Sequence, residues 1–277
     1  MAPDLDKSLR QFIEAFEGYL RSSFEEIWSK VKIDADHLDA FSVVGALLAR
    51  QVTLAVELAN APSAWNGHSA PLFLRAMTDL HITLAWITGD LVERSNKYLL
   101  HGLGEVKLLI EHYKASHEGR PEEESNEQIR TMIDIWQGWL DGQRRDLFVE
   151  VNLGHWAQMD VRRMAQEEQL EELYKFAYKP FSQAAHSMWP HVSVYNARRC
   201  RDPLHRYHLI PALVEAPLDV DFLYRACKYV DKTYAIFAAK FGASPEGPMP
   251  LAWWRDYFSE SGDPDGTAGT DGGDDVA

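Results

Sequence analysis

Apolar residues recur at intervals of three and four along most of the chain, and this spacing constrains the fold more than any other feature. Between residues 5 and 31, for example, Leu9, Phe12, Phe16 and Leu20 are interspersed with charged residues. A helix has about 3.6 residues per turn, so this spacing places the apolar side chains on one face. The apolar and polar alternation that is typical of strands is absent over any useful length. The pattern therefore predicts an all-α fold.

The same periodicity, together with capping and breaking residues, predicts the other helices. They are expected at residues 36–59, 69–89, 91–117, 123–148, 160–169, 170–189 and 219–242. Pro180 should kink or break its helix, because proline lacks an amide hydrogen and crowds the preceding turn. Asp219 as N-cap and Gly242 after the last turn should bound the final helix. Residues 191–218 contain three prolines and are expected to be mostly loop.

The first five predicted helices are long and closely connected, which favours an antiparallel helical bundle with additional C-terminal helices packed on it. We expect residues 1–258 to form a single all-helical domain. Residues 259–277 hold six acidic residues, no Lys or Arg and few large apolar residues. Burial cannot offset the entropy of ordering such a segment, so it is predicted to be a disordered acidic tail.

Charge and hydropathy limit the classes of partner. The chain has 42 acidic and 28 basic residues, which argues against a broad nucleic-acid-binding face. No stretch of roughly 18 to 20 uninterrupted apolar residues suggests a membrane span. The N-terminal residues lack the basic and apolar regions of a secretory signal, so we expect a cytoplasmic protein without a membrane partner.

The only cysteines are Cys200 and Cys227, and no C-x-x-C spacing is present. We expect both to be reduced thiols in the core, which excludes a structural zinc site formed through cysteine. Another metal-like spacing is Asp202, His205 and His208, but Pro203 lies inside it and no distant fourth ligand stands out. Motifs for phosphate loops, dinucleotide binding, nucleophile elbows and zinc helices are also absent. We therefore expect neither a metal nor a cofactor.

Two runs of polar residues lie on otherwise apolar helices. Arg75 and Asp79 are one turn apart in one helix, and Tyr178, Ser182 and His186 follow at intervals of four in a later one. Each run lies along one helix face, so the five side chains are expected to meet in a hydrogen-bond network. The network either holds two helices in register, or places His186 as a general acid or base while Arg75 binds an anion or a phosphate.

Residues 74–109 and 155–186 resemble the bacterial domain-of-unknown-function 5677 family. In that family an Arg is followed four residues later by a Glu. A Trp, a short helix with Arg and Met, and a Tyr-x-x-x-Ser-x-x-x-His helix come later. Here the first pair is Arg75 and Asp79, with Asp in place of Glu, and Pro180 departs from the apolar residue of the later motif. The resemblance implies an α-helical fold and brings no established reaction.

The chain is also similar, more loosely, to HEPN proteins, helical bundles of which many cut RNA with an Arg-x(4 to 6)-His motif. In that chemistry the His transfers a proton and the Arg stabilises the charge of the phosphorane, without a metal. The pairs that fit are Arg75/His81, Arg94/His101, Arg198/His205, Arg199/His205 and Arg201/His208. Arg201 and His208 are the preferred catalytic pair, with Arg198 and Arg199 beside them to bind RNA.

Two classes of function follow from these patterns. The first is an HEPN-like effector or toxin of bacterial defence that cleaves RNA without a metal. The alternative is a non-catalytic helical sensor or assembly module, which binds a small ligand, a protein from the same operon or a second copy of the chain. An enzyme needs convergent, solvent-reachable Arg and His groups. A module needs those groups buried and satisfied, with an exposed apolar patch elsewhere.

Overall fold

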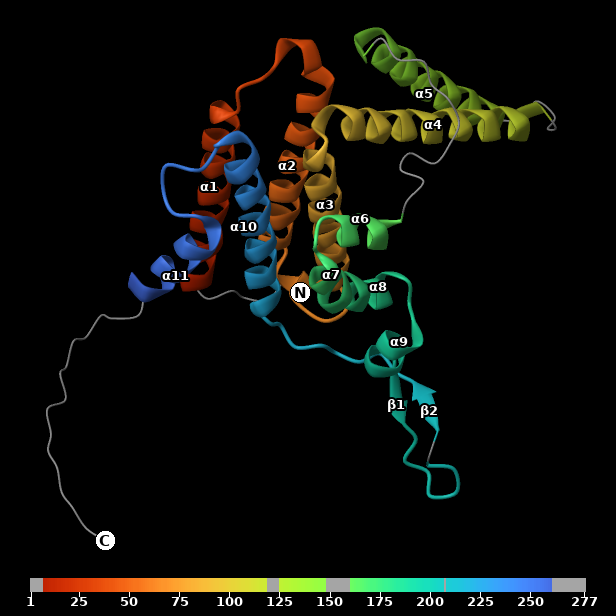
Figure 1. The fold of residues 1–277 in the computed structure, drawn as a ribbon. Helices are drawn as coiled ribbons and strands as arrows, with labels where there is room; N and C mark the ends of the chain where they lie inside the picture. The colour runs from red at the N-terminus through yellow and green to blue at the C-terminus, as the bar shows by residue number, and fades with distance from the viewer. Residues whose placement is uncertain (1–6, 119–124, 148–159, 207, 261–277) are drawn as a thin grey trace, which may run out of the picture.

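A computed structural model describes residues 7–118, 125–147, 160–206 and 208–260, and it confirms the all-α fold (Figure 1). Within these residues the strands are two short ones that pair in a single hairpin. The predicted tail lies almost wholly outside the described residues. The last helix continues through Ser259 and Glu260, past the expected domain boundary at residue 258.

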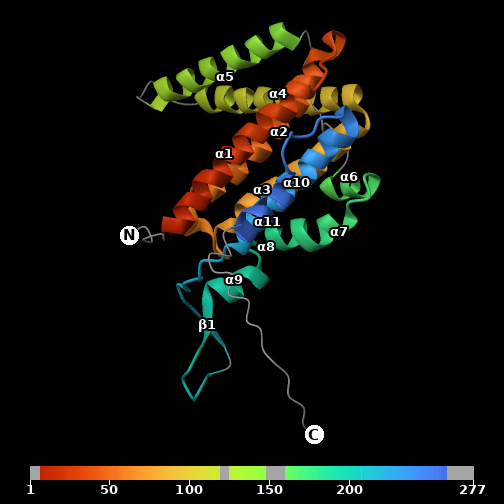
Figure 2. The same ribbon diagram turned by 90° about the vertical axis from the view of Figure 1, so that its left-hand side faces the viewer.

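Four long helices lie side by side and form the body of the molecule (Figures 1 and 2). They are α1 (Lys7–Lys30), α2 (Leu38–Ala59), α3 (Ala70–Gly89) and α10 (Asp221–Phe241). Short 3-10 turns at Ala35–His37 and Pro62–Ala64 flank α2. The periodic apolar residues of these helices face one another, and Leu20, Leu48, Ile82 and Phe237 are fully buried in the core.

The C-terminal end of α10 follows the predicted signal, whereas its N-cap is Val220 and not the predicted Asp219. Asp219 accepts a hydrogen bond from the backbone N–H of Asp221 at 2.9 Å, and Gly242 ends the helix with a positive φ of 64°. A further helix that the sequence pattern did not predict, α11 (Pro250–Glu260), follows. It covers α1 through aromatic contacts, in which the Trp254 ring meets Phe12 and Phe16 edge to face.

Helices α4 (Leu91–Glu118) and α5 (Ser125–Leu147) form an antiparallel pair that projects from the body (Figure 1). The pair has a small core of its own, made by Leu103, Ile110 and Leu140. Both helices begin and end within two residues of the predicted bounds.

The predicted helix at residues 170–189 is divided. It consists of α7 (Glu171–Leu173), a π-helical turn (Tyr174–Tyr178) and α8 (Lys179–Ala185), and it follows the short α6 (Val161–Glu167). The break expected at Pro180 takes the form of the wide π turn just before it. Pro180 itself lies in the first turn of α8, where its missing amide hydrogen is not needed. Ser187, with a φ of 49°, follows the end of α8.

Residues 191–218 were expected to be mostly loop, and this is only partly correct. They include most of a short helix, α9 (Trp189–Tyr195), and two strands, β1 (Ala197–Arg199) and β2 (Leu209–Pro211). The strands pair antiparallel, with Ala197 opposite Pro211 and Arg199 opposite Leu209. We call residues 189–214 the arm, because they extend away from the body in both views (Figures 1 and 2).

One helix in the described residues, Ala35–Ala59, is long and apolar enough to span a membrane by length and composition alone. About 67% of its apolar window is buried inside the fold. Its apolar residues are therefore accounted for by the core, and the helix is weak evidence for a membrane span.

Candidate functional site

Four of the five residues of the predicted polar network meet between α3 and α8. Arg75 donates from Nε to Ser182 Oγ at 2.7 Å and from Nη2 to the hydroxyl of Tyr178. Its third nitrogen, Nη1, lies 3.3 Å from Asp79 Oδ2, and the guanidinium lies 3.4 Å above the centre of the Tyr178 ring. Protein partners therefore engage all three guanidinium nitrogens and one face of the group.

The carboxylate of Asp79 is incompletely paired. Burial raises the pKa of Asp79, and the neighbouring Arg75 lowers it again only in part. Its Oδ1 atom is buried without a hydrogen-bond partner in the described part of the chain. The hydrogen-bonding capacity of the network is thus used at Arg75 and incompletely used at Asp79.

His186 does not join the network, and the prediction that it would is wrong. Helix α8 ends at Ala185, and His186 is an exposed residue at its C-cap. Its backbone N–H donates to Ser182 O at 3.0 Å, while its side chain makes no hydrogen bond or ion pair among the described residues. Ser187, the next residue, has a left-handed backbone conformation, which ends the helical path just after His186.

A second arginine network was not predicted from the sequence. Arg94 at the start of α4 donates to Glu168 Oε1 at 2.9 Å and lies 4.4 Å from the centre of the Trp86 ring. Trp86 in turn donates from Nε1 to Glu167 at 2.8 Å. The sequence shows Glu167 and Glu168 as an acidic pair at the end of α6. No local spacing connects this pair to Arg94, which lies over 70 positions earlier in the chain.

His81, from one of the candidate Arg/His pairs, is buried between α3 and α10. Its Nδ1 lies 3.1 Å from Thr233 Oγ1, and that hydroxyl donates to the carbonyl of Tyr229. His81 must therefore carry its proton on Nδ1 and donate to Thr233. Burial, with a contribution from Lys232, lowers the pKa of His81 to about 4. A neutral and enclosed imidazole of this kind supports packing.

An open cavity of about 560 Å³ lies beside His81, lined by α3, α10 and the turn after α6. Its wall is mainly apolar, with Ala85, Leu170 and Ile236, and a few charged residues such as Glu168 and Lys232 stand among them. This composition is typical of small-ligand pockets. The sequence pattern did not reveal the cavity, because its walls come from three separate segments.

The arm carries the remaining candidate residues on its surface. Arg198 and Arg199 lie on β1, and Arg201 and His208 lie in the connection between the strands, all of them exposed. The preferred pair is therefore solvent-reachable, and no hydrogen bond joins the side chains of Arg201 and His208 among the described residues.

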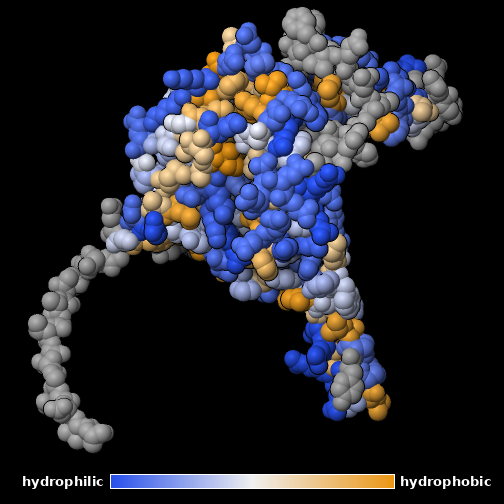
Figure 3. Space-filling model, viewed as in Figure 1, coloured by the Kyte–Doolittle hydropathy of each residue, from blue (hydrophilic) through white to orange (hydrophobic). Residues whose placement is uncertain are grey.

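Apolar side chains are exposed on the same arm. Leu204 and Leu213 have relative exposures of 93% and 98%, and Trp189 and Val194 exceed 60%. The space-filling view shows orange apolar residues beside blue polar ones along the arm (Figure 3). Such a concentration of exposed apolar groups on a projecting element is typical of an interaction surface.

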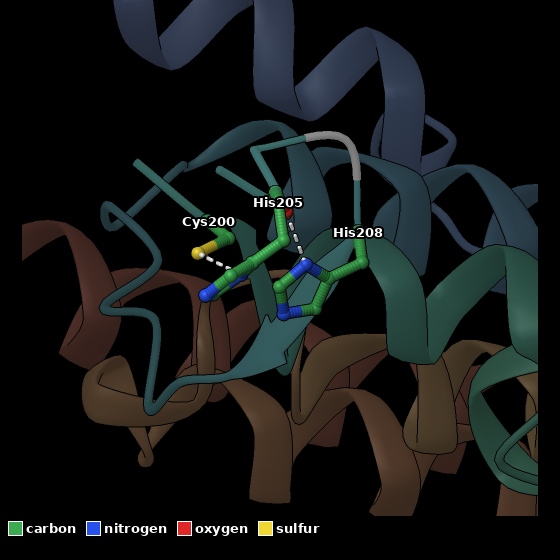
Figure 4. Close-up of side chains that lie close together, drawn as sticks. All are labelled: Cys200, His205 and His208. Carbon is green, nitrogen blue, oxygen red and sulfur yellow. Dashed lines mark hydrogen bonds between the residues drawn. The ribbon is translucent and has the colours of Figure 1, made fainter. Parts of the chain in front are cut away.

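Cys200 departs from expectation as well. Cys227 is buried in the body, as predicted, but Cys200 is half-exposed in the arm and lies beside two imidazoles (Figure 4). One ligand atom each from Cys200, His205 and His208 lies within 4.8 Å of the others. The prediction that both thiols lie in the core is therefore wrong for Cys200.

Comparison with known proteins identifies one family. The model described as "Family of unknown function (DUF5677)" matches residues 41–202, more than half of the chain. The match includes the Arg75 network and ends inside the arm, before His205 and His208. No curated protein and no solved structure matches the chain.

Proposed function

The chain belongs to the DUF5677 family of unknown function, and we propose that it is a non-catalytic helical assembly module that acts in the cytoplasm. The observation that carries this proposal is the exposed apolar arm. The surface to which the arm docks is the acidic body of a second copy of the chain.

The Arg75 network supports a structural role for the body. Its guanidinium is committed to Ser182, Tyr178 and Asp79, and His186 lies apart from it. An acid–base site would need an imidazole within about 3 Å of the reacting group. The network instead joins α3 to α8, and so helps to hold the segment from which the arm extends.

The arm has the properties of a docking element. Leu204 and Leu213 would each bury an almost fully exposed side chain on association, and a buried leucine contributes about 1.5 to 3 kcal/mol. In the folded single chain, the side chains of Leu204 and Leu213 remain exposed to water. Association is the simplest way in which the chain removes it.

Charge complementarity indicates the partner. The hairpin, residues 197–211, contains four arginines and one aspartate, whereas the remaining residues contain 24 basic and 41 acidic side chains. A basic arm is attracted to an acidic body, and the attraction is screened by salt. A second copy of this chain offers such a body.

The test is the molar mass of the purified chain, measured by light scattering across a range of concentration and salt. We expect a dimer or larger assembly that dissociates on dilution. The double substitution Leu204→Asp, Leu213→Asp should make the chain monomeric. Leu38→Asp is the matched control, since Leu38 is also exposed but lies at the start of α2. A wild-type chain that stays monomeric at all concentrations would refute the proposal.

A second candidate function is the HEPN-like cleavage of RNA, in an effector or toxin of bacterial defence. The observation that favours it is the group of exposed arginines, Arg198, Arg199 and Arg201, beside His205 and His208 on one hairpin. Arginines of this kind bind phosphates, and an exposed imidazole can transfer a proton.

Incubation of the chain with RNA, with and without EDTA, separates the two candidates. A metal-independent ribonuclease should cut RNA in both, and Arg201→Ala and His208→Ala should each abolish cleavage without unfolding the chain. His186→Ala is the control, because it removes an exposed imidazole outside the arm. If the purified chain cuts no RNA under either condition, the cleavage candidate is rejected and the assembly module remains.

A further inference from the structure

The backbone of the arm brings Cys200 and His208 together. The N–H of Cys200 donates to the carbonyl of His208 at 3.0 Å, which continues the pairing of β1 and β2 by one position. The two side chains thus start from neighbouring points on adjacent strands. The intervening turn returns His205 toward Cys200, so that three potential ligands converge at the base of one loop (Figure 4).

The separation of the first two ligand atoms fits a tetrahedral metal ion. Cys200 Sγ and His205 Nδ1 are 3.5 Å apart. Zinc–sulfur and zinc–nitrogen bonds of about 2.3 and 2.0 Å, at a tetrahedral angle, place such atoms about 3.5 Å apart. The whole group spans at most 4.8 Å, so small side-chain rotations suffice to place His208 on the same ion.

The outer contacts of the two imidazoles match those of metal ligands. His205 Nε2 lies 3.1 Å from Asp202 Oδ2, and His208 Nδ1 lies 2.5 Å from the carbonyl of His205. Each ring therefore has an acceptor for its N–H on one nitrogen, which leaves the other nitrogen's lone pair for an ion. Metal-bound histidines nearly always have such a carboxylate or carbonyl partner.

Two backbone contacts hold the group in place. Asp202 donates its N–H to Cys200 Sγ at 3.4 Å, as amides often do to a thiolate. The Asp202 side chain accepts from the N–H of Leu204 at 2.9 Å, which fixes the turn between the ligands. Asp202 thus orients both Cys200 and His205 while remaining outside the ligand set.

From this geometry we propose that Cys200, His205 and His208 bind one Zn²⁺ ion, with water at the fourth position. A thiolate and two imidazoles form a borderline-soft donor set, which suits zinc and disfavours Mg²⁺ and Ca²⁺. The bound ion joins β1, the turn and the start of β2. It therefore orders the loop that contains Arg201 and Leu204, whichever partner the arm contacts.

The experiment uses the full chain without a purification tag, stripped of metal with EDTA and then titrated with ZnCl₂ by calorimetry. We expect one Zn²⁺ per chain, and no binding of Mg²⁺ or Ca²⁺. With Co²⁺ as a spectroscopic substitute, the chain should show the thiolate charge-transfer absorption and strong visible bands of a tetrahedral site. Cys200→Ser should remove the charge-transfer absorption, and His205→Ala and His208→Ala should weaken the visible bands.

Asp202→Asn tests the orienting contact, and it should lower zinc affinity about 10- to 100-fold while keeping the stoichiometry. Cys227→Ala is the control for the thiol, and Arg201→Ala is the control for the loop. Both should bind Zn²⁺ as the wild-type chain does. The proposal is overturned if Cys200→Ser, shown to be folded by circular dichroism, keeps the zinc affinity and the cobalt spectrum, or if the wild-type chain binds no zinc. Neither outcome depends on whether the chain assembles or cuts RNA.

Discussion

At the scale of single residues, Arg75 is the most heavily engaged polar side chain that the sequence singled out. It contacts Ser182 in α8, Tyr178 in the π-helical turn before α8, and Asp79 one turn along its own helix. About 40% of the Asp79 side chain is exposed, so solvent weakens that ion pair to no more than about 1 kcal/mol. Most of the stabilisation by Arg75 therefore comes from its contacts with Ser182 and Tyr178.

Replacing Arg75 by Ala should lower the free energy of unfolding by about 2 to 3 kcal/mol, from two hydrogen bonds of about 1 kcal/mol each and the stacking on Tyr178. His186→Ala should change it by less than about 0.5 kcal/mol, because His186 is exposed. Urea unfolding of both variants is the measurement. Equal losses in the two variants would contradict the structural assignment of the network.

His81 should make stability depend on pH. Its pKa is lowered to about 4 in the folded chain, against about 6.5 when unfolded, so the unfolded state binds more protons between these values. The contribution of neutral His81 to stability is then fully present above about pH 6.5. As the pH falls toward about 4, the free energy of unfolding decreases by roughly 2 to 3 kcal/mol.

The measurement is the free energy of unfolding of the wild-type chain and of His81→Asn, determined at several pH values between about 4 and 6.5. The Asn side chain keeps a donor for Thr233 but does not titrate, so the decline with pH should be shallower in the variant. If the free energy of unfolding changes with pH equally in both chains, the pKa of His81 is the same in the folded and unfolded states, which would contradict the prediction.

At the scale of elements, the contacts that join the described part of the arm to the body include the packing of α9 on α8, an aromatic contact and a hydrogen bond. Tyr195 at the end of α9 packs edge to face on His68, and His68 Nε2 lies 2.7 Å from the carbonyl of Val214. Gly67 lies so close that a Cβ there would fall 2.2 Å from the Tyr195 hydroxyl. The absence of a side chain at residue 67 is thus part of the attachment.

Gly67→Ala should displace Tyr195 and loosen the arm while leaving the body folded. We expect faster hydrogen exchange in residues 189–214 and little change in the melting temperature. Gly18→Ala is the control, because a Cβ at residue 18 meets no atom within 4 Å. Unchanged exchange in the arm of Gly67→Ala would show that Tyr195 does not attach it.

At the scale of the whole molecule, a compact acidic body carries two projections, the α4–α5 pair and the basic arm (Figure 1). The α4–α5 pair has its own apolar core and exposes Ile135 and Trp139 by about half, whereas the arm exposes Leu204 and Leu213 almost fully. The arm is therefore the projection that association would stabilise most.

Removal of residues 261–277 should leave the melting temperature within about 5 °C of the full chain, equivalent to roughly 1 kcal/mol. The removed residues include few large apolar side chains that could contribute to a core. Differential scanning calorimetry of the two chains is the measurement. A larger decrease would mean that these residues dock on the body.

The sequence by itself determined the helices of the body, because helix formation depends on neighbours three and four residues apart. The bounds of α1 to α5 and the cap at Gly242 follow from such local signals. It also determined the pairing of Arg75 with Tyr178 and Ser182, since two polar runs on apolar faces are satisfied best by each other. The family follows from the same central residues.

Only the tertiary structure decided the rest. The exclusion of His186 depends on where α8 ends, one residue before it, and the packing of α11 depends on aromatic residues at the opposite end of the chain. The approach of Cys200 to His205 and His208 depends on strand pairing, which no helical period predicts. Each of these features arises from where the backbone turns, and a turn of a few residues carries too little periodicity to be recognised in advance.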